Sequence, residues 1–287
     1  MKKFLKIRGK ELAEIRGNKI FTKELNAPIN IIEKKVDGSY VCRFNNNHVY
    51  LKKTPWGDYY TSLFNKRIDP TCYCSDKLKT VFCLVSRNAN TSIILSGMHA
   101  DGKEGLENYS NEKLVWHDKE LMDYCQKYNK LLPLSQVKIE KFEKFVIVLD
   151  DPIKRYIRTL NKIYIDSSLI YLVGDFKNEE NLSRFIDECL YYSVLCERDK
   201  DFLWERHLGL QKTYFDKCKE KKVDWEIVKL ENLPKWWEET YNSKWLRNNV
   251  MGENKKIINK DKFSQKQWEK MMNYLDKDIK FWKEINQ

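Results

Sequence analysis

Two segments with the same layout constrain the fold of this chain more than any other feature. They run from Thr80 to Ile93 and from Phe145 to Leu160, and each has an apolar run, a polar turn with a basic side chain, and a helical pattern. In an α/β protein this layout places polar groups at the carboxyl end of a strand and the amino end of a helix, where phosphate groups bind. The pair therefore predicts a bound nucleotide.

Strand and helix patterns alternate through residues 76–287, which predicts one α/β domain with a parallel sheet flanked by helices. The clearest strand is Phe145–Leu149, because an unbroken apolar run is typical of a strand buried on both faces. Further strands are expected at 77–85, 114–116 and 225–230. Helices are expected at 91–98, 119–128, 154–161, 178–194 and 262–285.

Residues 1–75 are predicted to form a β-rich extension. The segments 36–41 and 48–51 flank a polar turn at Asn45–Asn47, as in a hairpin. Residues 1–70 hold 15 of the lysines and arginines but only 7 acids, in a chain with a formal net charge of +11. This region suits an acidic glycan, a nucleic acid or an anionic membrane surface, and an ordinary lysine-rich solvated surface explains it equally well.

Size and composition exclude several classes of protein. A chain of 287 residues with 42% hydrophobic side chains can bury a full core. No apolar run approaches the roughly 20 residues of a membrane span, and the first residues lack the apolar stretch of a secretory signal. We therefore expect a cytoplasmic protein. Its eight cysteines are expected to be buried thiols, and we predict no metal site, because Cys72 and Cys74 have no second ligand pair.

The first polar turn offers groups that can surround a phosphate or sulfate. The Arg87 guanidinium can hold two oxygens at once, and backbone N–H groups, amides and hydroxyls add further donors. Glycine is absent, so this is no Walker A loop. Taken alone, it could be an ordinary strand-to-helix turn. The residues that we assign to cofactor binding here are Ser86, Arg87, Asn88, Asn90, Thr91 and Ser92.

The second polar turn adds Arg155 and Arg158, which are three residues apart and so share one face of a helix. That face could bind a second phosphate. The alternative is a solvated helix start whose acids, Asp150 and Asp151, interact favourably with the helix dipole.

Together, the two turns resemble those of the carbohydrate sulfotransferases that use 3′-phosphoadenosine 5′-phosphosulfate (PAPS). That family has a Pro-Lys-x-x-x-Thr-Ser loop for the 5′-phosphosulfate, to which Ser86, Arg87, Thr91 and Ser92 correspond. Its second motif, Arg-Asp-Pro-x-x-Arg-x-x-Ser, binds the 3′-phosphate. The corresponding residues here are Asp150, Asp151, Pro152, Arg155 and Arg158.

Two further stretches of the chain agree with this resemblance, which covers about residues 77–285. A His-x-x-x-Gln element and a Glu-x-Leu segment match His207 to Gln211 and Glu231 to Leu233. The closing helix, over Tyr274 to Trp282, is similar to an Asp-x-x-x-Phe/Trp pattern. The resemblance implies a P-loop-like sulfotransferase fold, PAPS as cofactor and a glycan as acceptor.

The chain departs from the family at three positions. Arg87 stands in place of the lysine of the first loop. In the second motif, Asp150 replaces the first arginine and would repel a 3′-phosphate, while Arg158 replaces the serine and would return a positive charge.

The resemblance implies in-line transfer of a sulfuryl group to a sugar hydroxyl. Arg87 would stabilise the transferring group, and His117, after the expected strand 114–116, would be the general base. His99 and Glu104 are alternatives for the base. For His117, a surface histidine at a turn is the competing interpretation.

Two other functions stay open. A sulfotransferase-like protein that binds a glycan or nucleotide without catalysis is favoured by Asp150. A basic nucleic-acid-binding protein would use aromatic side chains of the first region as stacking platforms, but we expect no nucleic-acid partner, because no recognition motif is present. Those aromatics are Tyr40, Tyr50, Trp56 and Tyr59. A second cluster, near Trp237, is assigned to core packing over sugar stacking.

Overall fold

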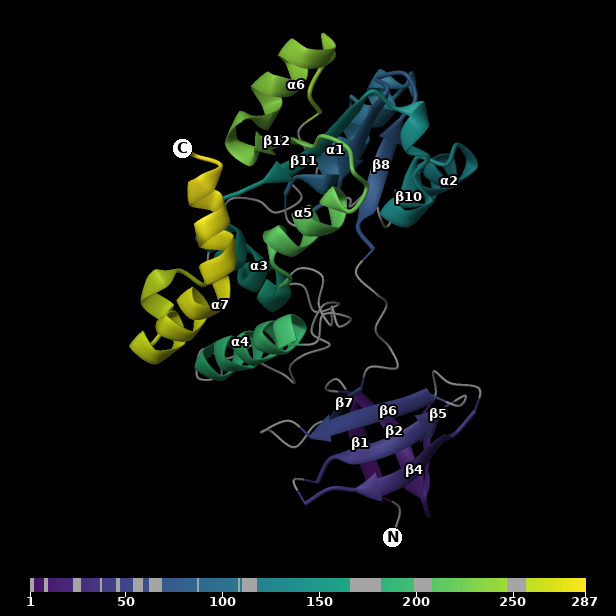
Figure 1. Cartoon of the computed structure of the whole chain (residues 1–287), viewed down its shortest axis with the longest axis vertical. Helices are drawn as coiled ribbons and strands as arrows, with labels where there is room; N and C mark the ends of the chain where they lie inside the picture. Colours follow the sequence, from purple (N-terminus) through teal and green to yellow (C-terminus); the bar gives the residue numbers. More distant parts are fainter. Residues whose placement is uncertain are drawn as a thin grey trace. The chain divides into compact units, whose positions relative to one another are not determined.

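The structure is a computed structural model and describes most of the chain in thirteen segments. These are residues 3–7, 10–22, 27–36, 38–44, 47–53, 59–61, 69–86, 88–107, 109, 118–165, 182–198, 208–246 and 257–287. The chain forms two compact units (Figure 1). The first contains residues 1–67 and 162–204, and the second contains residues 68–161 and 205–287.

Seven strands of the first unit form a closed barrel (Figure 1). Neighbouring strands pair antiparallel, and the barrel closes where Ile7 of the first strand pairs in parallel with Tyr59 of the last. The predicted hairpin across Asn45–Asn47 is confirmed by the pairing of the fifth and sixth strands. The strands are β1 (Lys3–Ile7), β2 (Lys10–Arg16), β3 (Lys19–Thr22), β4 (Ile29–Lys34), β5 (Tyr40–Phe44), β6 (Asn47–Lys53) and β7 (Tyr59–Thr61).

The barrel interior is filled by apolar side chains. Tyr40 and Tyr59 are 4% and 8% exposed and contact each other there, with ring centroids 5.6 Å apart. Both are therefore core residues, and their burial disfavours the alternative hypothesis in which they serve as stacking platforms for nucleic acid. The Tyr50 side chain and Trp56 lie outside the described residues. The other core members are Ala13, Ile20, Ile29, Cys42 and Leu51.

The second unit contains a five-stranded sheet flanked by helices, in the order β10-β8-β9-β11-β12 (Figure 1). The strands β9, β11 and β12 run parallel, as predicted. β8 runs antiparallel to both of its neighbours, so the sheet is mixed and not parallel throughout. The strands are β8 (Thr71–Ser75), β9 (Thr80–Cys83), β10 (Leu131–Pro133), β11 (Lys144–Leu149) and β12 (Glu226–Lys229).

A short turn explains the antiparallel pair. Residues 76–79 connect β8 to β9, and Lys79 takes a left-handed conformation with φ of 51°. Two strands joined so tightly must run in opposite directions. The expected strand over 77–85 is thus shorter, and the sheet includes residues on both sides of the proposed domain boundary at 75/76.

Helices form close to where periodicity predicts them. They are α1 (Asn90–Ala100), α2 (Lys119–Lys127), α3 (Pro152–Ile165), α4 (Leu182–Arg198), α5 (Gln211–Lys219), α6 (Leu233–Tyr241) and α7 (Gln265–Glu284). The expected strand at 114–116 lies outside the described residues. Among the described residues, no helix is both long enough and apolar enough to cross a membrane.

Helices cover both faces of the mixed sheet. On one face, Trp237 of α6 is fully buried and stacks on Phe82 of β9, with centroids 5.2 Å apart. The Trp237 cluster is therefore core, as predicted. On the other face, hydrogen bonds with the thiols of Cys218, on α5, and Cys72 raise the pKa of Cys83 well above its usual value. These contacts fix α5 and α6 against the sheet.

Candidate functional site

The carboxyl ends of the parallel strands define the candidate site. After β9 the chain continues to β10 at one edge of the sheet, and after β11 it continues to β12 at the other edge. The direction of the connections therefore reverses between β9 and β11, and open α/β sheets bind ligands at such a reversal. The two polar turns predicted to bind phosphate, 86–92 and 150–158, follow these two strands.

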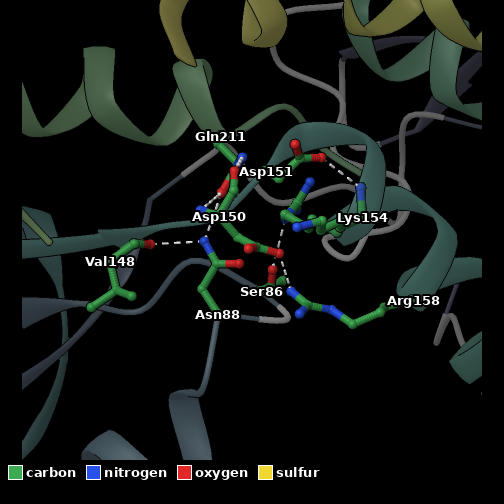
Figure 2. A network of polar contacts seen from close by, with 9 residues as sticks. Ser86, Asn88, Val148, Asp150, Asp151, Lys154, Arg158 and Gln211 are labelled. Carbon is green, nitrogen blue, oxygen red and sulfur yellow. Dashed lines mark hydrogen bonds and ion pairs between the residues drawn. The ribbon is translucent and has the colours of Figure 1, made fainter. Parts of the chain in front are cut away.

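Two buried amides join the turns. Nδ2 of Asn88 donates hydrogen bonds of 2.7 Å to the Val148 carbonyl oxygen and to Oε1 of Gln211. The Gln211 amide also pairs with the backbone of Asp150, accepting from its N–H at 2.9 Å and donating to its carbonyl oxygen at 2.7 Å. Figure 2 shows Asn88 reaching towards Val148, with Gln211 beside the Asp150 backbone. Asn88 is fully buried, so its amide nitrogen supports the loop and is not available to a ligand.

Arg155 supplies a further link between the turns. Its Nε donates a 3.0 Å hydrogen bond to the carbonyl oxygen of Ser86, and the residue is fully buried. A buried guanidinium is costly unless it is well hydrogen-bonded. Arg155 therefore holds the first turn through the Ser86 carbonyl, and its role as a phosphate ligand stays a prediction.

Asp150 and Arg158 form an ion pair at the start of α3 (Figure 2). The Asp150 side chain is 12% exposed and that of Arg158 is 43% exposed. Burial raises the pKa of Asp150, while the charge of Arg158 acts in the opposite direction. The positive charge that Arg158 was predicted to offer a phosphate is thus already balanced by a carboxylate.

The helix starts add backbone donors to this edge. Ala89 precedes α1 in a left-handed conformation, with φ of 59°, and its methyl side chain provides no cap for the helix. The first N–H groups of a helix need partners, and anions are suitable ones. The start of α3 differs, because the Lys154 N–H donates to Oδ1 of Asp151 at 2.8 Å.

A pocket of about 170 Å³ opens beside the second turn. It lies at the carboxyl ends of β11 and β12, and Trp282 of α7 and Asn286, which follows this helix, complete it. This volume is below the roughly 300–1,000 Å³ usual for a whole ligand, so it suits one ring or group. Three of its seven lining residues are acidic and one is basic; they are Asp150, Asp151, Lys154, Leu230, Glu231, Trp282 and Asn286.

The other predicted site residues fall into three groups. Asn90, Thr91 and Ser92 form the first turn of α1, where Asn90 and Thr91 are half-buried and Ser92 is 4% exposed. Arg87 and His117, the two predicted catalytic residues, lie outside the described residues, as does His207. His99 is nine residues beyond the start of α1, about 13 Å along the helix axis, so it cannot act as base at the α1 amino end.

Two polar residues of this edge have roles that sequence reasoning did not assign. Gln211 connects the turns, and the buried Asp278 of α7 accepts hydrogen bonds of 2.8 Å from the N–H groups of Gln211 and Lys212, which caps α5. Both residues occur in the motifs quoted for the sulfotransferase resemblance. Their polar character at inward-facing helical positions was the signal that could have revealed these roles. Glu231 and Asn286, which line the pocket, carry no comparable signal.

Comparison with protein-family models, with curated proteins and with solved structures finds no match for this chain.

Proposed function

We propose that the second unit is a sulfotransferase that moves a sulfuryl group from an adenosine phosphosulfate donor of the PAPS type to a carbohydrate hydroxyl. The observation that carries this proposal is the meeting of the two polar turns at the carboxyl ends of β9 and β11, where Arg155 contacts Ser86 and Asn88 contacts Val148. Nucleotides bind where parallel strands present such turns.

The α1 amino end is the candidate position for the phosphosulfate. The backbone N–H groups of its first turn, the hydroxyls of Ser86 and Thr91, and the guanidinium proposed for Arg87 supply donors without a lysine-containing P-loop. These groups orient the donor and balance the charge that develops on its sulfate and phosphate oxygens.

The reaction needs one acceptor and one base. The acceptor oxygen forms a bond to sulfur, the bond between sulfur and the bridging phosphate oxygen breaks, and the nucleotide 5′-phosphate leaves. The hydroxyl proton passes to a general base, for which His117 remains the proposed residue. Trp282 and the carboxylates of the pocket suit the ribose ring of the donor, because an aromatic face and several acceptors match its C–H and O–H groups.

A second candidate function is nucleotide or glycan binding without catalysis. The ion pair of Asp150 with Arg158 favours it, because it places a carboxylate where the resemblance implies a phosphate-binding arginine. Sulfate transfer distinguishes the two, since only an enzyme moves labelled sulfate from a phosphosulfate donor to a polysaccharide.

The test of the proposed function is calorimetric titration of the full chain with 5′-AMP and with 3′-phosphoadenosine 5′-phosphate, with adenosine as the control without phosphate. We expect at least one nucleotide to bind at micromolar concentration and adenosine to bind far more weakly. Arg87→Ala should weaken nucleotide binding by about tenfold or more. Lys266→Ala, an exposed position on α7, is the matched control and should leave it unchanged. If neither nucleotide binds to the wild-type chain, the proposed function is excluded.

A further inference from the structure

We infer that the ribose of the bound nucleotide carries a free 3′-hydroxyl, so that the sulfuryl donor is adenosine 5′-phosphosulfate and not its 3′-phosphorylated form. This inference rests on the proposed function and concerns the ribose end of the same site. It rests on the position and partner of Asp150.

Asp150 follows the end of β11 at the reversal in the sheet, and it is one of the residues that line the pocket there. The Gln211 amide holds the Asp150 backbone through two hydrogen bonds of 2.9 and 2.7 Å. The carboxylate itself is held by Arg158. An acidic side chain at this place is therefore a positioned group and not a mobile surface charge.

The charges around the pocket disfavour a phosphate at the ribose. Asp150, Asp151 and Glu231 face Lys154, which is the single basic residue among the seven that line the pocket. Two other cations act on Asp150: Arg158 is already paired with it, and Arg155 is buried and donates to the Ser86 carbonyl oxygen. A 3′-phosphate would bring up to two further negative charges towards three carboxylates.

A free ribose hydroxyl, unlike a 3′-phosphate, is favoured at this site. A carboxylate accepts hydrogen bonds from ribose hydroxyls, and in dinucleotide-binding folds an acid at the ribose selects the unphosphorylated cofactor while arginine accommodates the phosphorylated one. Asp150 supplies that acid. Arg158 is held in an ion pair with Asp150, so its charge is not available to a phosphate. Transfer from adenosine 5′-phosphosulfate would form the bond between the acceptor oxygen and sulfur and break the bond between sulfur and the bridging phosphate oxygen. AMP would leave, and the hydroxyl proton would pass to the general base.

The experiment compares 5′-AMP with 3′-phosphoadenosine 5′-phosphate on the full chain, as wild type and as Asp150→Asn. Wild type should bind 5′-AMP about tenfold or more tightly than the 3′-phosphorylated nucleotide. Asp150→Asn removes the repulsion and releases Arg158, so the preference should disappear or reverse. Asp123→Asn, at an exposed position on α2, is the control and should keep the wild-type preference.

The outcomes separate this inference from the proposed function. Equal or tighter binding of the 3′-phosphorylated nucleotide by wild type overturns the inference and leaves the proposed function standing. A preference for 5′-AMP that persists in Asp150→Asn also overturns it, because the carboxylate would not be the cause. Binding of neither nucleotide by wild type overturns the proposed function itself. Asp150→Ser replaces Asp150→Asn if circular dichroism shows that the latter does not fold.

Discussion

Nδ2 of Asn88 lies 2.7 Å from Oε1 of Gln211, a residue 123 positions further along the chain. This contact connects the turn after β9 to the first residue of α5, and Gln211 in turn holds the backbone at the end of β11. Three segments that are distant in sequence therefore share one buried amide. The candidate site depends on this amide for its shape.

Gln211→Ala should destabilise the second unit by about 3 kcal/mol or more. The substitution removes the partner of three hydrogen bonds, which are made by the Asp150 N–H, the Asp150 carbonyl oxygen and Nδ2 of Asn88. Each unsatisfied buried group costs about 1–3 kcal/mol. Urea unfolding followed by circular dichroism measures the change. Gln265→Ala, at the exposed start of α7, should change the free energy of unfolding by less than about 0.5 kcal/mol. Similar losses for the two variants would contradict a special role for Gln211.

Asp150 should make stability depend on pH. Burial raises its pKa in the folded state above the unfolded value, so the folded protein binds the proton more tightly. The contribution of this group to stability is present in full below the unfolded pKa of about 3.8 and is lost as the pH rises through the folded pKa. We expect the free energy of unfolding of wild type, relative to Asp150→Asn, to fall over this window.

Urea titrations of both proteins between about pH 3 and 7 provide this comparison. If the free energy of unfolding of wild type, relative to Asp150→Asn, instead rises with pH, the charge of Arg158 outweighs burial and folding lowers the pKa of Asp150.

Gly97→Ala should destabilise the protein by about 3 kcal/mol, because α1 packs closely on β8. A Cβ atom at position 97 would lie 2.2 Å from Cε1 of Tyr73, whose ring is fully buried and whose hydroxyl donates to Asp101 at 2.9 Å. Thermal unfolding measures the effect. The comparison is Gly105→Ala, where no atom lies within 4 Å and only the φ of +78° opposes a side chain. Its cost should be about 1 kcal/mol, and an equal loss at position 97 would refute the packing argument.

Lys130→Met should cost about 3 kcal/mol. The ammonium lies 3.0 Å from Oδ2 of Asp101 and 2.8 Å from Oδ2 of Asp76, and the Asp101 side chain is only 3% exposed. Removing the cation leaves a buried carboxylate without its charge partner. Lys127→Met, an exposed position at the end of α2, is the control for added apolar surface. The double variant Lys130→Met with Asp101→Asn should be more stable than Lys130→Met alone, and a further loss would show that the pair is not coupled.

The local sequence pattern was sufficient to predict many strands and helices of the second unit. The apolar run Phe145–Leu149 predicted the buried strand β11, and helical patterns predicted α1, α2 and α7 within a few residues. It also indicated that the turns after β9 and β11 carry the polar groups of one edge, because parallel strands end on the same side. Burial of the Trp237 ring followed from the same periodicity.

Local pattern could not decide the partners of charged side chains. Arg155 and Arg158 are three residues apart and look alike in sequence, yet one is fully buried against Ser86 while the other is 43% exposed beside Asp150. The barrel closure between Ile7 and Tyr59 and the antiparallel direction of β8 likewise depend on contacts between distant segments.

The physical reason is the range of the interactions. Strand and helix periodicity depends on residues that are close in sequence. The sequence by itself therefore determined the strands and helices and the strand ends at which the polar turns lie. Whether a guanidinium meets a carbonyl, a carboxylate or water depends on which distant segment folds against it. That choice, and with it the charge of the candidate site, was decided by the tertiary structure.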